Sequence, residues 1–161
     1  MLKKIAIATP MAVLALSSSM VFAADPISTT INVRAFIPTS QFNVAPQNPN
    51  FGRDEVMTQL VGGELSTVDA IFNLKHTDSK GAINALIEGS AVLYNGRDSI
   101  PLTVTIGSVE LAATTKEIVN ETDSVPGVQR ALRIKAKKPT ASQTGDFTSS
   151  FAVVFEPVLK P

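Results

Sequence analysis

The sequence ISTTINVRAFI, residues 27–37, alternates between two kinds of side chain. One face carries Thr29, Ile31, Val33, Ala35 and Ile37. The residues between them are polar until Phe36 breaks the pattern. Period-two alternation rich in β-branched residues predicts a half-buried strand rather than a helix. Pro38 ends this strand, because proline has no backbone N–H to donate to a neighbouring strand.

The segment before this strand, residues 1–23, has the features of a secretion signal. Lys3 and Lys4 precede an interrupted apolar run, and Val21-Phe22-Ala23 forms a small-x-small cleavage site. The apolar run is shorter than the ~20 residues that a membrane-spanning helix needs. Cleavage after Ala23 would leave residues 24–38 as a free N-terminal segment, here called the arm. We expect the arm to be a strand that is given to another molecule.

The remaining chain, residues 39–161, is predicted to form one domain. The mature chain, residues 24–161, lacks Lys3 and Lys4, so the 14 basic and 14 acidic residues of the full sequence become 12 and 14, a net charge of −2. This charge gives no indication of a nucleic acid or an anionic membrane as partner. The sequence has no cysteine, so stability must come from core packing and strand pairing rather than from disulfides.

The domain shows strand patterns separated by turns. Phe42 and Val44 predict a short edge strand followed by a loop. Val68, Ala70, Phe72 and Leu74 alternate in the next strand, and the composition of residues 76–81 predicts a turn. The strand pattern resumes in residues 82–94. Asn95-Gly96, a strong hairpin signal, follows it, and the next predicted strand spans residues 99–106.

The C-terminal third is less uniform. Residues 112–118 could form a single helical turn or an irregular crossover. Residues 131–137 predict a strand with Leu132 and Ile134 inward, and a polar loop follows. The last predicted strand spans residues 147–158, and the positions on its apolar face are Phe147, Phe151, Val153 and Phe155. Strands at this spacing without a long amphipathic helix predict an antiparallel all-β domain, either a sandwich or a barrel.

The sequence contains no recognisable catalytic or metal-binding pattern. His76 is the only histidine, and its place in a polar turn predicts a solvated side chain. A nucleophilic triad or a zinc site would need further residues at set spacing, and no phosphate-binding fingerprint occurs. The carboxylates are scattered among turns, which favours surface roles, although a glycosidase-like carboxylate pair stays open. We therefore expect no enzyme activity, no cofactor and no metal.

Four stretches resemble the major pilin subunits of the coli-surface-antigen and colonisation-factor fimbriae, the alpha-class (class 5) chaperone–usher pili. The stretches are TTINVRAFIP at 29–38, HTDSKGAINALI at 76–87, SIPLTVTIGSVELAATTKEI at 99–118 and TGDFTSSFAVVF at 144–155. The chain departs from the family in residues 39–62, which match poorly. It departs again at its end, EPVLKP, a charged tail that contains proline.

The resemblance implies an incomplete immunoglobulin-like antiparallel β-sandwich that lacks its final strand. It implies an acceptor groove beside the last strand, formed by Phe147, Phe151, Val153 and Phe155, and a donor strand formed by Thr29, Ile31, Val33, Ala35 and Ile37. The implied partners are identical pilin subunits, a periplasmic chaperone, an outer-membrane usher, a tip adhesin subunit and a host-cell receptor. The implied place is an adhesive fimbrium on the bacterial surface, reached through the periplasm. The direction of the donor strand in the groove stays open.

Two other classes of protein are alternatives to a pilin subunit. A self-contained secreted β-sandwich, or a minor or tip adhesin, would be a binding module. Tip adhesins usually carry an additional binding domain, for which this chain has no room. A secreted enzyme is disfavoured for want of a catalytic constellation.

Overall fold

The structure is a computed structural model that describes residues 41–161. The predicted signal peptide and the arm lie outside the described residues. The described part has nine strands and one short helix. In chain order they are β1 (Phe42–Pro46), β2 (Val68–His76), β3 (Gly81–Gly89), β4 (Val92–Tyr94), β5 (Ser99–Ile106), β6 (Val109–Glu110), β7 (Lys116–Val119), α1 (Glu121–Ser124), β8 (Val128–Ala136) and β9 (Phe151–Leu159).

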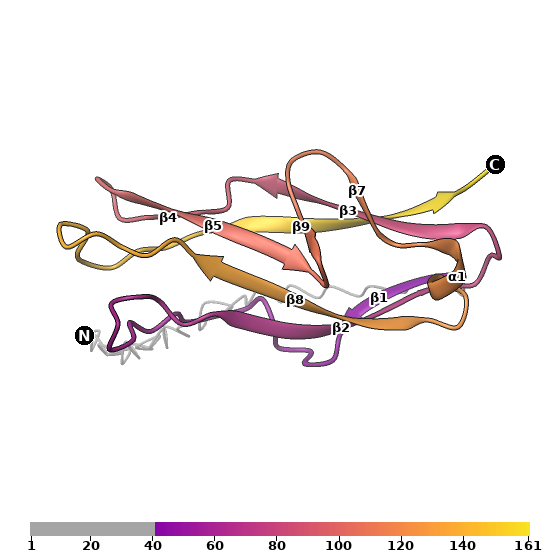
Figure 1. Cartoon of the computed structure of the whole chain (residues 1–161), viewed down its shortest axis with the longest axis horizontal. Helices are drawn as coiled ribbons and strands as arrows, with labels where there is room; N and C mark the ends of the chain where they lie inside the picture. The colour runs from indigo at the N-terminus through magenta and orange to yellow at the C-terminus, as the bar shows by residue number, and fades with distance from the viewer. Residues whose placement is uncertain (1–40) are drawn as a thin grey trace, which may run out of the picture. The chain divides into compact units, whose positions relative to one another are not determined.

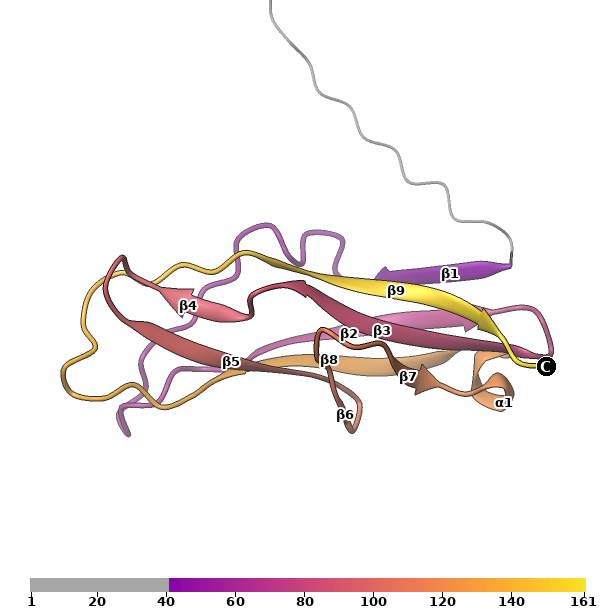
Figure 2. The same cartoon turned by 90° about the horizontal axis from the view of Figure 1, so that it is seen from above.

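The strands form two antiparallel sheets. The larger sheet has the order β1-β2-β8-β5-β4, with β6 paired to β5, and the smaller one has the order β7-β3-β9. Figure 1 shows β3 and β9 above β2 and β8. Figure 2 shows β1 and β9 along the same side of the sandwich, each at the margin of its own sheet. The prediction of an antiparallel all-β domain is confirmed, and the architecture is a sandwich rather than a barrel.

The core lies between the sheets and follows the alternation of the sequence. In β2 the apolar face predicted from the sequence turns inward, with Leu74 only 1% exposed. Val104 and Ile106 of β5 and Leu132 of β8 are each 1% exposed, and Ile83 of β3 is completely buried. Side chains of alternate residues thus meet from both sheets, as expected for a β-sandwich.

Two predicted turns are present. The Asn95-Gly96 pair lies in the hairpin between β4 and β5, where the Asn95 side chain accepts hydrogen bonds from the amides of Arg97 (3.0 Å) and Asp98 (2.6 Å). Gly96 has a φ of +92°, which glycine adopts without strain. The turn between β2 and β3 is closed by the Gly81 amide, which donates to the Asp78 carbonyl at 2.9 Å.

Residues 112–118 form a crossover and not a helical turn. β6 precedes it, and β7 begins at Lys116 and pairs with β3. The one helical turn comes later, in α1, where the Asn120 side chain accepts a hydrogen bond from the Asp123 amide at 2.9 Å. This is the pattern of an N-cap.

The prediction of a solvated His76 is wrong. His76 is the last residue of β2 and is only 5% exposed. Its Nδ1 accepts a hydrogen bond from the Asp78 amide at 3.1 Å, and its ring lies 6.1 Å from that of Phe42. The physical reason is the alternation of β2, because His76 follows Phe72 and Leu74 on the inward face.

The last strand is shifted from its predicted bounds. β9 begins at Phe151, opposite Gly89, the last residue of β3, and Phe147 therefore lies outside the strand. Thr148 pairs with Tyr94 in an isolated bridge. The C-terminal tail is not loose, since β9 continues to Leu159.

Candidate functional site

A groove of about 930 Å³ opens in the sandwich beside β9. One part of its lining is β9 with the segment before it, residues 145–150, and another is Pro46 with residues 51–57. The apolar remainder comes from the larger sheet and from the segment before β2: Leu65, Val68, Phe72, Leu93, Leu102, Leu132 and Ile134. The groove therefore reaches the core of the domain.

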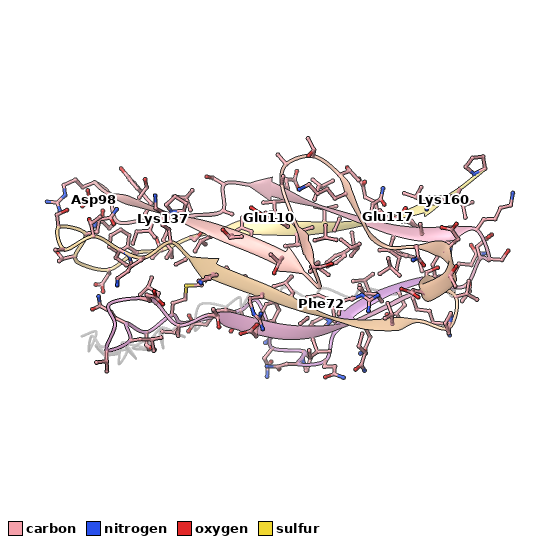
Figure 3. The ribbon with its side chains drawn as sticks, viewed as in Figure 1. Phe72, Asp98, Glu110, Glu117, Lys137 and Lys160 are labelled. Atoms are coloured by element: carbon pink, nitrogen blue, oxygen red, sulfur yellow. The ribbon has the colours of Figure 1, made fainter. Side chains whose placement is uncertain are left out.

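The side chains that β9 contributes to the groove are only partly buried. Phe151, Val153 and Phe155 pack against the core without being covered. Phe155 stacks on Phe72 with ring centroids 5.5 Å apart, and Phe51 meets Phe72 edge-on at 5.7 Å. Figure 3 labels Phe72 near β2 and β8 of the larger sheet. Phe51 and Phe155 stay partly exposed beside the buried Phe72, and soluble proteins usually cover an apolar surface of this kind.

Within residues 41–161, the backbone of β9 pairs with a strand on one edge and leaves a free edge on the other. β9 pairs with β3 in one continuous register, and one residue past it the Lys160 amide donates to the Lys80 carbonyl at 2.9 Å. Hydrogen-bonded pairs alternate with non-hydrogen-bonded pairs in an antiparallel ladder, so the even-numbered residues of β9 bond to β3. Accordingly Ile87, opposite Val153, donates its amide to Ala112 on the other side of β3, at 2.8 Å.

The odd-numbered residues of β9 thus point their N–H and C=O groups away from β3. No strand among residues 41–161 pairs with this edge. The residues that combine a free backbone edge with a side chain in the groove are Phe151, Val153 and Phe155.

The structure brings the four predicted acceptor residues together. Phe147, Phe151, Val153 and Phe155 all line the groove, and so does Ser149. Their role as an acceptor stays a prediction. The predicted donor residues Thr29, Ile31, Val33, Ala35 and Ile37 lie outside the described residues. Phe51 also lines the groove but is not predictable from the sequence, because it stands in a Pro- and Asn-rich loop without an alternating pattern.

Lys160, just after the C-terminal end of β9, forms two ion pairs. The Lys160 Nζ lies 2.8 Å from a carboxylate oxygen of Glu117 in β7 and 2.8 Å from one of Glu121 in α1. Figure 3 shows Lys160 and Glu117 at the same end of the sandwich. The hydrogen bond from Lys160 lowers the pKa of Glu121, and the hydrogen bonds to Glu117 and Glu121 raise the pKa of Lys160.

The described residues contain no group of three His, Asp or Glu side chains that could hold a metal ion. The only helix in residues 41–161 has four residues, too few to cross a membrane. His76 lies within the domain and does not line the groove. The features that the groove offers to a partner are therefore an apolar surface and an unpaired strand edge.

Two of three comparisons with known proteins find matches. The family model of the CS1 type fimbrial major subunit matches residues 27–156. The solved structure of the CooA pilin subunit from enterotoxigenic Escherichia coli aligns with a TM-score of 0.60 and 13% sequence identity, covering 73% of this chain and 87% of that chain. Among curated protein sequences, none matches the chain.

The structural likeness shows the fold, an incomplete immunoglobulin-like sandwich, and the family match covers most of the sequence. The family consists of structural subunits rather than enzymes. The chain belongs to the CS1 type fimbrial major subunit family, and it is a structural pilin that polymerises with other pilin subunits into a cell-surface fimbria.

Proposed function

We propose that the groove beside β9 receives the arm of a second copy of this chain, so that subunits join by donor-strand exchange. The observation that supports the proposal most is the free edge of β9 next to the half-buried Phe151, Val153 and Phe155. Unpaired N–H and C=O groups on an edge strand are a template for another strand. In the added strand, the backbone pairs with the edge while alternate side chains enter the groove.

The arm has the composition that such a site requires. Thr29, Ile31, Val33, Ala35 and Ile37 share one face at period two. If fully buried, Ile31, Val33 and Ile37 would each stabilise the joint by ~1.5–3 kcal/mol. Each hydrogen bond of the new ladder would add ~1 kcal/mol. Together, these contributions would make a stable junction between two subunits, although the chain has no cysteine for a disulfide.

The same edge requires protection before assembly. An uncovered apolar edge strand promotes aggregation, so we infer that a periplasmic chaperone occupies the groove first. On this proposal, residues 1–23 direct the chain to the periplasm, and an outer-membrane usher exchanges the chaperone for the arm of the next subunit. A tip adhesin subunit and a host-cell receptor complete the set of partners.

A self-contained binding module is the competing function. A complete sandwich would bury the inward face of every strand, whereas no residue of β9 is buried. In a domain without a partner, the large apolar side chains of β9 would stay partly exposed, although their burial is favourable.

The test replaces two arm residues on the predicted inward face, Ile31→Asp with Val33→Asp. Charged groups in an apolar groove cost several kcal/mol unless they neutralise or find partners. We expect the double variant to be secreted to the periplasm but to be absent from fibres. The matched control is Thr30→Asp with Asn32→Asp, which places the same charges on the outward face and should assemble. Normal fibres from the Ile31/Val33 variant would refute the proposed exchange.

A further inference from the structure

Pro157 interrupts the free edge of β9. It lies opposite Ile83 of β3 and is exposed. Its number is odd, so it belongs to the set of residues that point away from β3. Proline has no N–H, and the pairing of β9 with β3 therefore loses no hydrogen bond at this position. The free edge, in contrast, lacks a donor there.

The groove ends at the same place. The last residue of β9 that lines it is Phe155. Beyond Pro157, the side chain of Leu159 is 63% exposed. The apolar lining thus ends at Phe155, and the row of backbone donors is interrupted two residues later, at Pro157.

We propose that Pro157 ends the acceptor edge, so that a docked arm pairs with β9 along residues 151–155 and no further. The inference rests on the proposed strand exchange and adds the residue that limits its register. A proline at an edge also blocks unwanted pairing with other strands. Pro157 lies just past residue 156, the last residue that the family model matches, so the proposed limit concerns this chain.

The test measures amide hydrogen exchange, residue by residue, in fibres of the full chain and in the subunit without a partner. Assembly should slow the exchange of the amides of Phe151, Val153 and Phe155 by more than about tenfold. The amide of Leu159, which faces the same edge, should exchange equally fast in both states. Protection of Leu159 on assembly would overturn the inference, because the ladder would then pass Pro157.

The variant Pro157→Ala restores the missing donor. Because Pro157 is exposed, the change removes little packing. We expect the amides of residue 157 and of Leu159 to become protected in these fibres. If they still exchange freely, the edge ends for a reason other than the proline, and the inference is wrong.

Pro101→Ala is the matched control. Pro101 is also an exposed strand proline, but its carbonyl accepts the Lys137 amide at 2.9 Å, so its backbone faces the occupied edge toward β8. The control should leave the exchange of Leu159 unchanged. Failure of the strand exchange itself would give a different result, with no protection of Phe151, Val153 or Phe155 in wild-type fibres.

Discussion

β3 and β9 are neighbours of equal length with opposite surroundings. Each has nine residues, and they pair with each other along their whole length. β3 lies between β7 and β9, and Ala82, Ile83, Ala85 and Ile87 are buried. β9 carries larger apolar side chains, yet none of its residues is buried.

This difference shows that the burial of β3 and β9 depends on the strands beside them and not on their amino-acid composition. β3 has a partner on both sides, whereas β9 has one partner among the described strands and the groove on the other side. An apolar strand that is only partly buried can be buried further by an incoming strand, and this additional burial is favourable. Substitutions in both strands can show whether β9 behaves as the uncovered counterpart of β3.

The largest effect is expected from Phe151→Ala in assembled fibres. Removing the ring should cost ~3–5 kcal/mol if the docked arm buries it. In the subunit without an arm the cost should be smaller, because the ring is then only half-covered. Double-mutant cycles with Ala at Ile31, Val33 or Ile37, followed by the thermal stability of fibres, should give a coupling of ~0.5–3 kcal/mol for at least one pair. Additivity for all three pairs would place the arm elsewhere.

The same measurement on Ile83→Ala serves as the contrast. Ile83 is completely buried within the subunit, so its truncation should cost ~2–5 kcal/mol whether or not an arm is docked. A cost that appears only in fibres would show that β3, too, depends on the neighbouring subunit. The distinction between the two strands would then fail.

A smaller effect is expected from Gly81→Ala at the start of β3. A Cβ there would overlap with the Nδ1 of His76, so the buried imidazole would have to move. Overpacking of this kind costs ~1–3 kcal/mol, and the melting temperature should fall. The control is Gly62→Ala, which would meet no atom within 4 Å. Equal melting temperatures for the two variants would mean that the covered side of the sandwich is loosely packed.

Lys160→Gln should have the smallest effect, because exposed ion pairs contribute little. The pKa of Glu121 is lowered from 4.5, so its contribution is present above pH 4.5 and is lost as the pH falls through the folded-state value. The pKa of Lys160 is raised from 10.5, so its contribution is present below pH 10.5 and is lost as the pH rises further.

The melting temperatures of Lys160→Gln and of the unchanged chain, followed against pH, should therefore differ most between these limits and should converge outside them. A difference that stays constant across the whole range would mean that Lys160 stabilises the end of β9 by packing rather than by charge.

The sequence predicted those parts of the fold that depend on local pattern. The alternation of Val68, Phe72 and Leu74 gave the inward face of β2, and Asn95-Gly96 gave the hairpin. The same alternation extends to His76, but its polar neighbours suggested a turn. Burial of a polar residue depends on what packs over it, here Phe42 and Gly81, and no local pattern contains that information.

The site was predictable in part for the same reason. The apolar face of the last strand could be recognised from Phe151, Val153 and Phe155, but the start of the strand could not. β9 begins where its partner β3 ends, at Gly89, and this is a property of the pairing. The outward direction of the Pro157 backbone also depends on register, which only the structure provides.

The claim that β9 lacks a strand is tested most directly by a single chain that carries its own copy of the donor strand. Residues 39–161 are followed by a flexible linker and a copy of residues 27–37, and the control carries Ile31→Asp and Val33→Asp in that copy. A tethered strand has a high effective concentration, so the fusion should be a monomer that melts more than about 10 °C above the control. Equal melting temperatures would contradict the claim that β9 lacks a strand that the arm supplies.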